Sequence, residues 1–173
     1  MVMNDDLLGT DINAIARIHG TFTLRSGQVS NEYFDKYRFE SDPALLRRIA
    51  RRMLQLLPSD TQVLAGLELG GVPIATAMSL ESGLPAAFIR KEAKSYGTCK
   101  AVEGLDIKGK KVTFIEDVIT TGGAVVDAAK LVNAEGADIL AVVCAIWRGK
   151  GEPSLPGLPD LSVFPALLAS ELR

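Results

Sequence analysis

Two adjacent carboxylates, Glu116 and Asp117, follow an apolar run at residues 112–115 and precede a segment of hydroxyls and glycines. That segment reads Val118, Ile119, Thr120, Thr121, Gly122, Gly123 and Ala124. A helix predicted from about residue 123 to 135 provides a helix N-terminus, whose free N–H groups and positive dipole end suit a phosphate. Carboxylates repel phosphate but accept hydrogen bonds from sugar hydroxyls. The pattern therefore favours a sugar phosphate as the ligand.

The same segment has a purely structural alternative, in which Thr120 or Thr121 caps the helix after a buried strand. That alternative accounts for one hydroxyl and leaves two carboxylates at the mouth of an apolar strand unexplained. We therefore expect these residues to line a binding site.

Four cations, Arg90, Lys91, Lys94 and Lys100, lie within eleven residues of one another. A solvated surface loop is the simplest interpretation of such a charge run. Its position directly after a predicted strand at residues 86–89 favours a binding role, because an anionic substrate of this chain must be met by local positive charge.

Arg148 follows the apolar run at residues 142–147. It is either a surface arginine at a strand end or a guanidinium fork that binds a carboxylate or carbonyl of a substrate. Tyr33 and Phe34 either stack near a planar ligand or pack the N-terminal segment. Both pairs of alternatives stay open at the level of sequence.

His19 is the only histidine among the 173 residues, which excludes a zinc site built from several histidines. The formal net charge of −2 argues against nucleic acid as a partner. Two cysteines, Cys99 and Cys144, define no disulfide framework. No secretory signal is evident, and no apolar run approaches the ~20 residues of a membrane span. We therefore expect a cytoplasmic protein without a membrane partner.

The elements that must position these residues alternate between strands and helices. A helical stretch over about residues 4–19 precedes short strands around a turn at 26–27, and a helix begins near Pro43. Apolar strands are predicted at residues 63–67, 86–89, 112–115 and 139–146, with helices at about 70–82 and 123–135. This order is typical of an α/β fold with a mostly parallel central sheet flanked by helices. Ligands bind beyond the carboxyl ends of such strands, so the loops beginning at Glu68, Arg90, Glu116 and Trp147 should share one crevice.

Residues 112–124 resemble the motif that binds phosphoribosyl pyrophosphate (PRPP) in type I phosphoribosyltransferases: an apolar strand, two acids and Thr-Thr-Gly-Gly. The chain lacks the Gly-Lys-Ser/Thr of a Walker P-loop and the Gly-x-Gly-x-x-Gly of a Rossmann fingerprint at this place. Residues 22–35 and 90–98 resemble the orotate-binding segment and the mobile catalytic loop of orotate phosphoribosyltransferases. Arg148 matches their arginine after the last core strand, and residues 69–73 resemble their pyrophosphate loop.

The resemblance implies transfer of ribose-5-phosphate from PRPP to orotate, which gives orotidine 5′-phosphate and pyrophosphate in de novo pyrimidine (UMP) biosynthesis. Catalytic roles are implied for Lys94, Tyr96 and Asp117. PRPP binding is implied for Gly70, Gly71, Arg90, Lys91, Lys94, Glu116, Asp117, Val118, Ile119, Thr120, Thr121, Gly122, Gly123 and Ala124. Orotate binding is implied for Arg25, Tyr33, Phe34, Thr120 and Arg148. Mg²⁺ is implied as a cofactor held mainly by PRPP or pyrophosphate and water, with no direct side-chain ligand. A homodimer is implied in which the loop at residues 90–106 completes the neighbouring site.

Two positions depart from the family: Arg25 stands where lysine is frequent, and Tyr96 where histidine is frequent. A tyrosine is a poor proton carrier at neutral pH. A phosphoribosyltransferase for another base and a PRPP-binding regulatory protein remain as alternatives. We expect a single phosphoribosyltransferase domain over residues 1–173, with a cap at about 1–42, a core at 43–150 and a C-terminal tail at 151–173.

Overall fold

A six-stranded sheet forms the centre of the computed structural model, which describes residues 7–24, 26–92 and 101–173. The strand order is β5-β4-β3-β6-β7-β8; β5 is antiparallel to β4, and the other neighbours are parallel. The strands are β3 (Val63–Leu67), β4 (Ala86–Ile89), β5 (Val102–Glu103), β6 (Lys111–Ile119), β7 (Asp138–Trp147) and β8 (Val163–Leu168). The predicted α/β fold with a mostly parallel sheet is confirmed.

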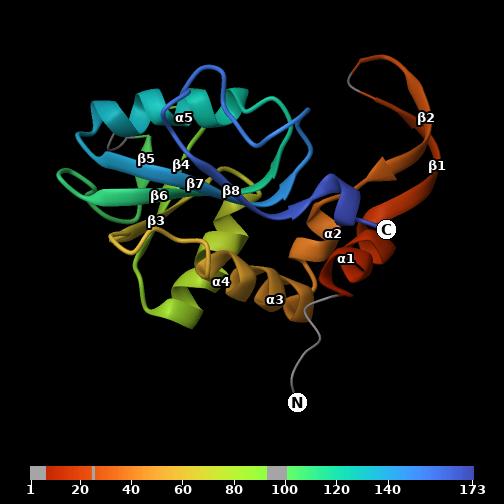
Figure 1. Cartoon of the computed structure of the whole chain (residues 1–173), viewed down its shortest axis with the longest axis horizontal. Helices are drawn as coiled ribbons and strands as arrows, with labels where there is room; N and C mark the ends of the chain where they lie inside the picture. Colours follow the sequence, from red (N-terminus) through yellow and green to blue (C-terminus); the bar gives the residue numbers. More distant parts are fainter. Residues whose placement is uncertain (1–6, 25, 93–100) are drawn as a thin grey trace.

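Helices cover both faces of this sheet (Figure 1). They are α3 (Pro43–Leu54) and α4 (Gly71–Ser82) on one face and α5 (Gly123–Ala134) on the other. The layers follow from the alternation of side chains along a strand: Leu64 and Ile115 pack with α3 and α4, whereas Ala65 and Phe114 pack with α5. A helix with the length and apolar character to span a membrane is absent from the part of the chain that the structure describes.

β6 is longer than the sequence predicted, and this changes where the two adjacent carboxylates lie. The strand was expected to end at Ile115, but its pairing to β7 continues to Ile119, which lies opposite Trp147. Glu116 and Asp117 therefore lie inside the sheet and are 7% and 1% exposed. The prediction was wrong because two polar side chains suggested a strand end, whereas the tertiary context of the neighbouring strands decides how far a strand extends.

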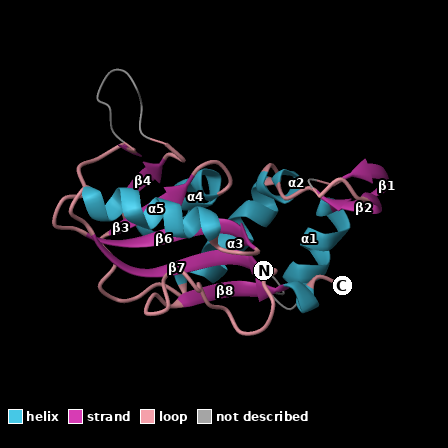
Figure 2. Ribbon diagram, turned by 90° about the horizontal axis from the view of Figure 1, so that it is seen from above, coloured by secondary structure: helices cyan, strands magenta, loops and turns pink. Residues whose placement is uncertain are grey.

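A cap formed by the N-terminal segment lies beyond one end of the sheet (Figure 2). Its elements are α1 (Leu8–Ala16), β1 (Arg17–Thr23), β2 (Val29–Phe34) and α2 (Tyr37–Glu40). β1 and β2 pair as an antiparallel hairpin that projects away from the sheet. The predicted strands around residues 26–27 are confirmed. The predicted helix over residues 4–19 was too long, because residues 17–19 pair with residues 32–34 of β2.

The C-terminal segment contributes an edge strand that was not predicted from the sequence. β8 runs parallel to β7, and its residues Ala166 and Leu167 join the core on the α3 side of the sheet. A short 3-10 turn at Ala169–Glu171 then brings Leu172 into the same core, close to α1 (Figure 1). Part of the expected tail is therefore structurally continuous with the sheet.

Replacing Leu167 with alanine should lower the free energy of unfolding by about 2–5 kcal/mol, because it leaves a cavity in the core. Leu167 is 2% exposed, whereas its neighbour Leu168 is 41% exposed and serves as the matched control. We expect Leu168→Ala to change the free energy of unfolding by no more than about 0.5 kcal/mol. Urea unfolding of both variants measures the difference, and equal losses would contradict the packing of β8.

Candidate active site

The loop between β6 and α5 has the backbone form of an anion-binding turn. Gly122, directly before α5, has a left-handed φ of 77°, and a side chain there would overlap Leu155. Thr120 and Thr121 are exposed, and no side chain in this described region caps the helix, so the capping alternative is wrong. The first N–H groups of a helix have no partner within it, which leaves those of α5 available to a phosphate.

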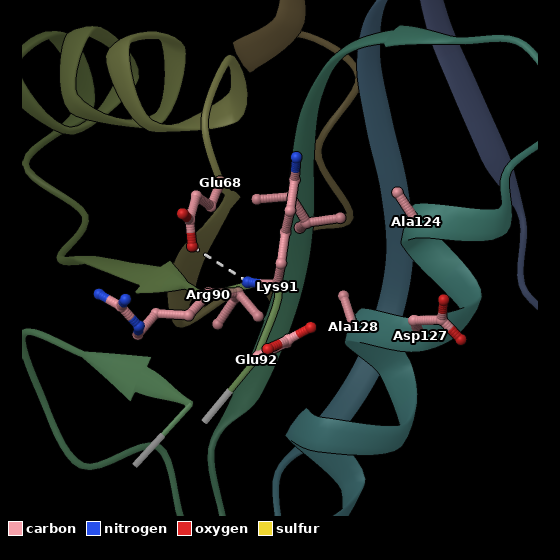
Figure 3. Close-up of a pocket in the computed structure, with 9 residues that line it drawn as sticks. Glu68, Arg90, Lys91, Glu92, Ala124, Asp127 and Ala128 are labelled. Carbon is pink, nitrogen blue, oxygen red and sulfur yellow. Dashed lines mark hydrogen bonds between the residues drawn. The ribbon is translucent and has the colours of Figure 1, made fainter. Parts of the chain in front are cut away.

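A cavity of about 340 Å³ opens beside this loop, at the ends of β3 and β4 (Figure 3). It is lined by Leu67, Glu68, Ile89, Arg90, Lys91, Glu92, Ala124, Asp127 and Ala128. We name it the loop cavity. Glu68 Oε2 accepts a hydrogen bond from the N–H of Lys91 over 3.0 Å, which joins the segments that follow two neighbouring strands.

The basic residues predicted to bind an anion are placed differently around the loop cavity. Lys91 is exposed at its edge. Arg90 extends away from α5 in Figure 3, and its Nη1 lies 3.9 Å from Glu103 Oε1 on β5. Three predicted site residues lie outside the described residues: Arg25, Lys94 and Tyr96.

A second cavity, of about 360 Å³, lies between the hairpin and the residues that follow β7 and β8. It is lined by Arg17, Leu24, Ser30, Glu32, Tyr33, Phe34, Arg148, Ala169 and Leu172, and we name it the aromatic cavity. The guanidinium carbon of Arg148 lies 5.2 Å from the centre of the Phe34 ring, a cation–π arrangement. Tyr33 packs in the cap, with its ring centroid 5.6 Å from that of Phe22, and is still 46% exposed. A planar anion would meet aromatic faces and a guanidinium in this one cavity.

The two cavities correct the expectation of one shared crevice. The segments that begin at Glu68 and Arg90 meet the start of α5 in the loop cavity, whereas Arg148 lines the aromatic cavity. The reason is the cap, whose hairpin supplies the facing wall for Arg148. A backbone hydrogen bond joins the segments that follow β6 and β7: the N–H of Arg148 donates to the carbonyl of Ile119, next to Thr120, over 2.8 Å.

Asp117 contacts the cap through Lys36 and the start of α4 through Gly70. Its Oδ2 is 2.5 Å from Nζ of Lys36, which follows the aromatic pair of the cap by two residues. Its carboxylate also packs against Gly70, where a Cβ would overlap it. Gly70 has an ordinary helical φ of −66°, so glycine is required there for space and not for conformation. A Cβ at Gly71 would likewise overlap the carbonyl oxygen of Ile115, so both glycines let α4 approach β6 closely.

The buried charges around Asp117 shift one another's pKa values. Burial favours a raised pKa for Asp117, but its hydrogen bonds with Glu116 and Lys36 outweigh burial and hold the pKa below its ordinary value. Burial lowers the pKa of Lys36, and the Asp117 carboxylate more than offsets this, so that pKa is raised. Burial, followed by the charge of Asp117, raises the pKa of Glu116 well above its ordinary value. The two shifts have opposite directions, so Asp117 ionises more readily than Glu116.

Glu40, the last residue of α2, is a third carboxyl in this group. It is 5% exposed, and neither of its carboxyl oxygens meets a hydrogen-bond donor among the described residues. Burial, followed by the charge of Asp117, raises the pKa of Glu40 to about 8. A protonated Glu40 is itself a donor and can share its hydrogen with the Asp117 carboxylate, which an ionised Glu40 cannot do.

Lys36 and Glu40 were not among the site residues predicted from the sequence, whose N-terminal motif ended at residue 35. The available signal is their spacing of four, which places a lysine and a glutamate on one helical face. Such pairs are also common on exposed helices. Only the approach of α2 to β6 reveals that both side chains face Asp117.

Glu40→Gln should flatten the dependence of stability on pH. Folding raises the pKa of Glu40 from 4.5 to about 8, so the unfolded chain ionises first and the folded state loses stability as pH rises through this window. Glutamine does not ionise, so the free energy of unfolding should fall less steeply with pH, by up to about 1.4 kcal/mol per pH unit. Urea unfolding at several pH values measures both slopes, with the exposed Glu152→Gln as control. Parallel slopes for wild type and Glu40→Gln would contradict a protonated Glu40.

Known proteins resemble this chain in both sequence and fold. The model of the phosphoribosyl transferase domain matches residues 38–156. An orotate phosphoribosyltransferase of Nocardioides sp. is 57% identical over 169 residues, which cover 97% of this chain and 94% of the relative. Another, of Pyrococcus horikoshii, is 39% identical over 175 residues, which cover 99% and 94%.

Solved structures agree with the sequence relatives. Mycobacterium tuberculosis orotate phosphoribosyltransferase in complex with Fe(III) dicitrate aligns with a TM-score of 0.83 at 28% identity, covering 97% of this chain and 98% of that one. The same enzyme in complex with PRPP aligns with a TM-score of 0.80 at 26% identity, with the same coverage. Adenine phosphoribosyltransferase from Leishmania donovani, at 16% identity and a TM-score of 0.68 over 99% of this chain and 84% of that one, shares the fold alone. Because the family model covers most of the chain and the sequence relatives cover nearly all of it, this protein belongs to the type I phosphoribosyltransferase family, among the orotate phosphoribosyltransferases.

Proposed function

We propose that this chain transfers ribose-5-phosphate from PRPP to orotate, giving orotidine 5′-phosphate and pyrophosphate in pyrimidine (UMP) biosynthesis. The observation that carries the proposal is the buried Asp117 carboxylate, which contacts Lys36 of the cap on one side and Gly70 at the start of α4 on the other. A carboxylate held at this place can accept hydrogen bonds from the hydroxyls of a sugar. The proposal includes the single-domain organisation and the cytoplasmic location expected from the sequence.

The proposed roles follow from the chemistry of each group. N–H and hydroxyl donors from Thr120 to Ala124 bind the 5′-phosphate, and Asp117 accepts hydrogen bonds from the ribose hydroxyls. Asp117 is 1% exposed, and its carboxylate is paired with Lys36, whose side chain is 34% exposed. Arg90, Lys91 and Lys94 offset the charge of the departing pyrophosphate, and Tyr96 donates a hydrogen bond there. The transition state resembles an oxocarbenium ion, so positioning and charge stabilisation suffice without a covalent nucleophile.

Arg148, Tyr33 and Phe34 are proposed to bind orotate in the aromatic cavity, together with Arg25 and Thr120. A guanidinium fork matches a carboxylate, and the aromatic faces suit a planar ring. The observed cation–π contact already holds Arg148 over Phe34, which limits the conformations that Arg148 must lose on binding.

Mg²⁺ belongs to the proposal as an ion carried by the substrate. Among the described residues, no three His, Cys, Asp or Glu side chains are grouped to hold a metal ion. We propose that oxygens of PRPP or pyrophosphate and of water hold the ion, because magnesium prefers such ligands. When bound, the ion offsets the charge of the pyrophosphate.

A panel of free bases, assayed with PRPP and Mg²⁺, tests the proposed function. Release of pyrophosphate with orotate and with no other base supports it. Turnover of a purine base alone would make the protein a phosphoribosyltransferase for another base. Binding of PRPP without turnover of any base would point to a PRPP-binding regulatory protein.

Arg148→Ala should impair the use of orotate and spare the binding of PRPP. Loss of charge-assisted hydrogen bonds to the base should lower kcat/KM for orotate by about 10- to 100-fold. Calorimetry with PRPP and Mg²⁺ should give a wild-type dissociation constant, because the loop cavity is unchanged. Lys150→Ala, an exposed position two residues away, is the control. Lost PRPP affinity with intact orotate affinity would refute this assignment of Arg148.

We further propose a homodimer in which the loop at residues 90–106 completes the neighbouring site. The hairpin of the cap supports it, because two-stranded hairpins are marginally stable alone. This hairpin projects from the sheet (Figure 2) with Val29 66% exposed, an apolar side chain that a second subunit would cover. In this arrangement Lys94 acts on the pyrophosphate of the partner's site and Asp117 on the ribose of its own.

Mixing two inactive variants, Lys94→Ala and Asp117→Asn, should restore activity after joint unfolding and refolding. About half of the dimers in a random mixture are hybrids, and each hybrid has one site with both residues intact. The mixture should therefore recover about a quarter of the wild-type activity. Native mass spectrometry establishes that hybrids form. If they form without activity, each loop serves its own subunit.

A further inference from the structure

α2 brings two charged side chains to one carboxylate of the sheet. Lys36 directly precedes this helix and Glu40 ends it, so their spacing of four places both on one face. Lys36 Nζ lies 2.5 Å from Asp117 Oδ2, and the Glu40 carboxyl interacts with the same side chain. Both residues belong to the cap, and neither lies in the motifs assigned to PRPP or orotate. The cap therefore directly contacts Asp117, the residue proposed to bind the ribose.

The net charge of this group is zero when only one of its carboxyls is ionised. It contains three carboxyls, Glu40, Glu116 and Asp117, and the ammonium of Lys36. If all three carboxyls ionised, two negative charges would stay uncompensated among side chains that are at most 7% exposed, which is costly. With Asp117 ionised and the other two carboxyls protonated, the ammonium and one carboxylate cancel. Lys36 is thus the group that selects which carboxyl carries the charge.

Three other titratable groups face this cluster, from two parts of the fold. Asp35 acts on Glu40 and Tyr37 acts on Lys36, both from the segment around α2. From β7, Cys144 lies opposite Glu116, and burial raises the pKa of its thiol, which stays neutral. None of these three is a cation, so none can replace Lys36 as the counter-charge of Asp117.

We propose that Lys36 is a positioning residue for Asp117: through α2, the cap holds this carboxylate ionised and oriented for the sugar, and Glu40 assists as a neutral hydrogen-bond donor. The inference rests on the proposed function only in its last step, the contact between Asp117 and the ribose. Its rival is an ion pair that merely fastens α2 to β6. Apolar side chains often replace such a buried pair without loss of stability, so stability alone does not separate the two roles.

Titration of Asp117 in the ligand-free protein tests the proposal without any substrate. The carbon-13 NMR signal of its carboxyl carbon reports ionisation directly. Lys36→Met removes the ammonium and keeps an unbranched side chain, so Asp117 should titrate about one pH unit or more above its wild-type midpoint. Lys36→Arg should keep a midpoint close to that of wild type. Lys110→Met, at an exposed lysine next to the opposite end of β6, is the matched control and should change nothing.

An Asp117 midpoint that is the same in Lys36→Met and wild type overturns the proposal. If Lys36→Met does not fold, Lys36→Gln repeats the titration with a polar side chain and the same expected direction. Glu40→Gln, which keeps a neutral donor beside Asp117, should leave the midpoint near that of wild type. A large upward shift in Glu40→Gln would assign the control of Asp117 to Glu40 and overturn the role of Lys36.

Kinetics with the same variants distinguishes this inference from the proposed function. In Lys36→Met, kcat/KM for PRPP should fall by about 10- to 100-fold at neutral pH, and the acid limb of its pH profile should move to higher pH. Lys36→Arg should recover most of the activity. A lowered melting temperature with an unchanged pH profile would reduce Lys36 to a structural ion pair and overturn the proposal. A wild-type enzyme that does not use orotate would overturn the proposed function, while a shifted Asp117 titration would still support the role of Lys36.

Discussion

The burial of the Asp117 carboxylate is the constraint on which the rest of this site depends. A carboxylate that is 1% exposed is tolerable only with a paired cation and satisfied hydrogen bonds. Lys36 supplies the cation, and the N–H of Val118 donates to Oδ1. The same burial requires a glycine at position 70, because any side chain there would occupy the space of the carboxylate. Their own burial, followed by the charge of Asp117, raises the pKa values of Glu40 and Glu116.

The length of β6 keeps this carboxylate inside the sheet. If the strand ended at Ile115, Asp117 would lie in a solvated loop. Because pairing to β7 extends to Ile119, the turn of Thr120 to Gly122 begins later, and the N-terminus of α5 opens on the loop cavity. The same pairing brings Trp147 to the end of the sheet, so that Arg148 emerges beside the cap. One strand thus sets the positions of both cavities.

The cap connects the aromatic cavity to the counter-ion of Asp117. β2 carries Tyr33 and Phe34 into the aromatic cavity, and within two residues the chain reaches Lys36 and the Asp117 carboxylate. Because this covalent connection is short, a movement of the hairpin would also move Lys36, the counter-ion of Asp117. The positive charge that an anionic substrate needs is therefore local, in a protein whose formal net charge is −2.

The sequence by itself determined the α/β class, the strands at residues 63–67 and 86–89, the helices that flank the sheet and the glycine-containing loop before α5. These features have local causes: continuous apolar runs, helical periodicity, a proline at a helix start and glycines where backbone must approach closely. Only the tertiary structure decided the end of β6, the pairing of residues 17–19, the edge strand β8, and the contact of Lys36 and Glu40 with Asp117. Each of these depends on a partner distant in sequence. How far a strand extends depends on the backbone with which it pairs. Whether a buried carboxyl is protonated depends on the charges packed around it.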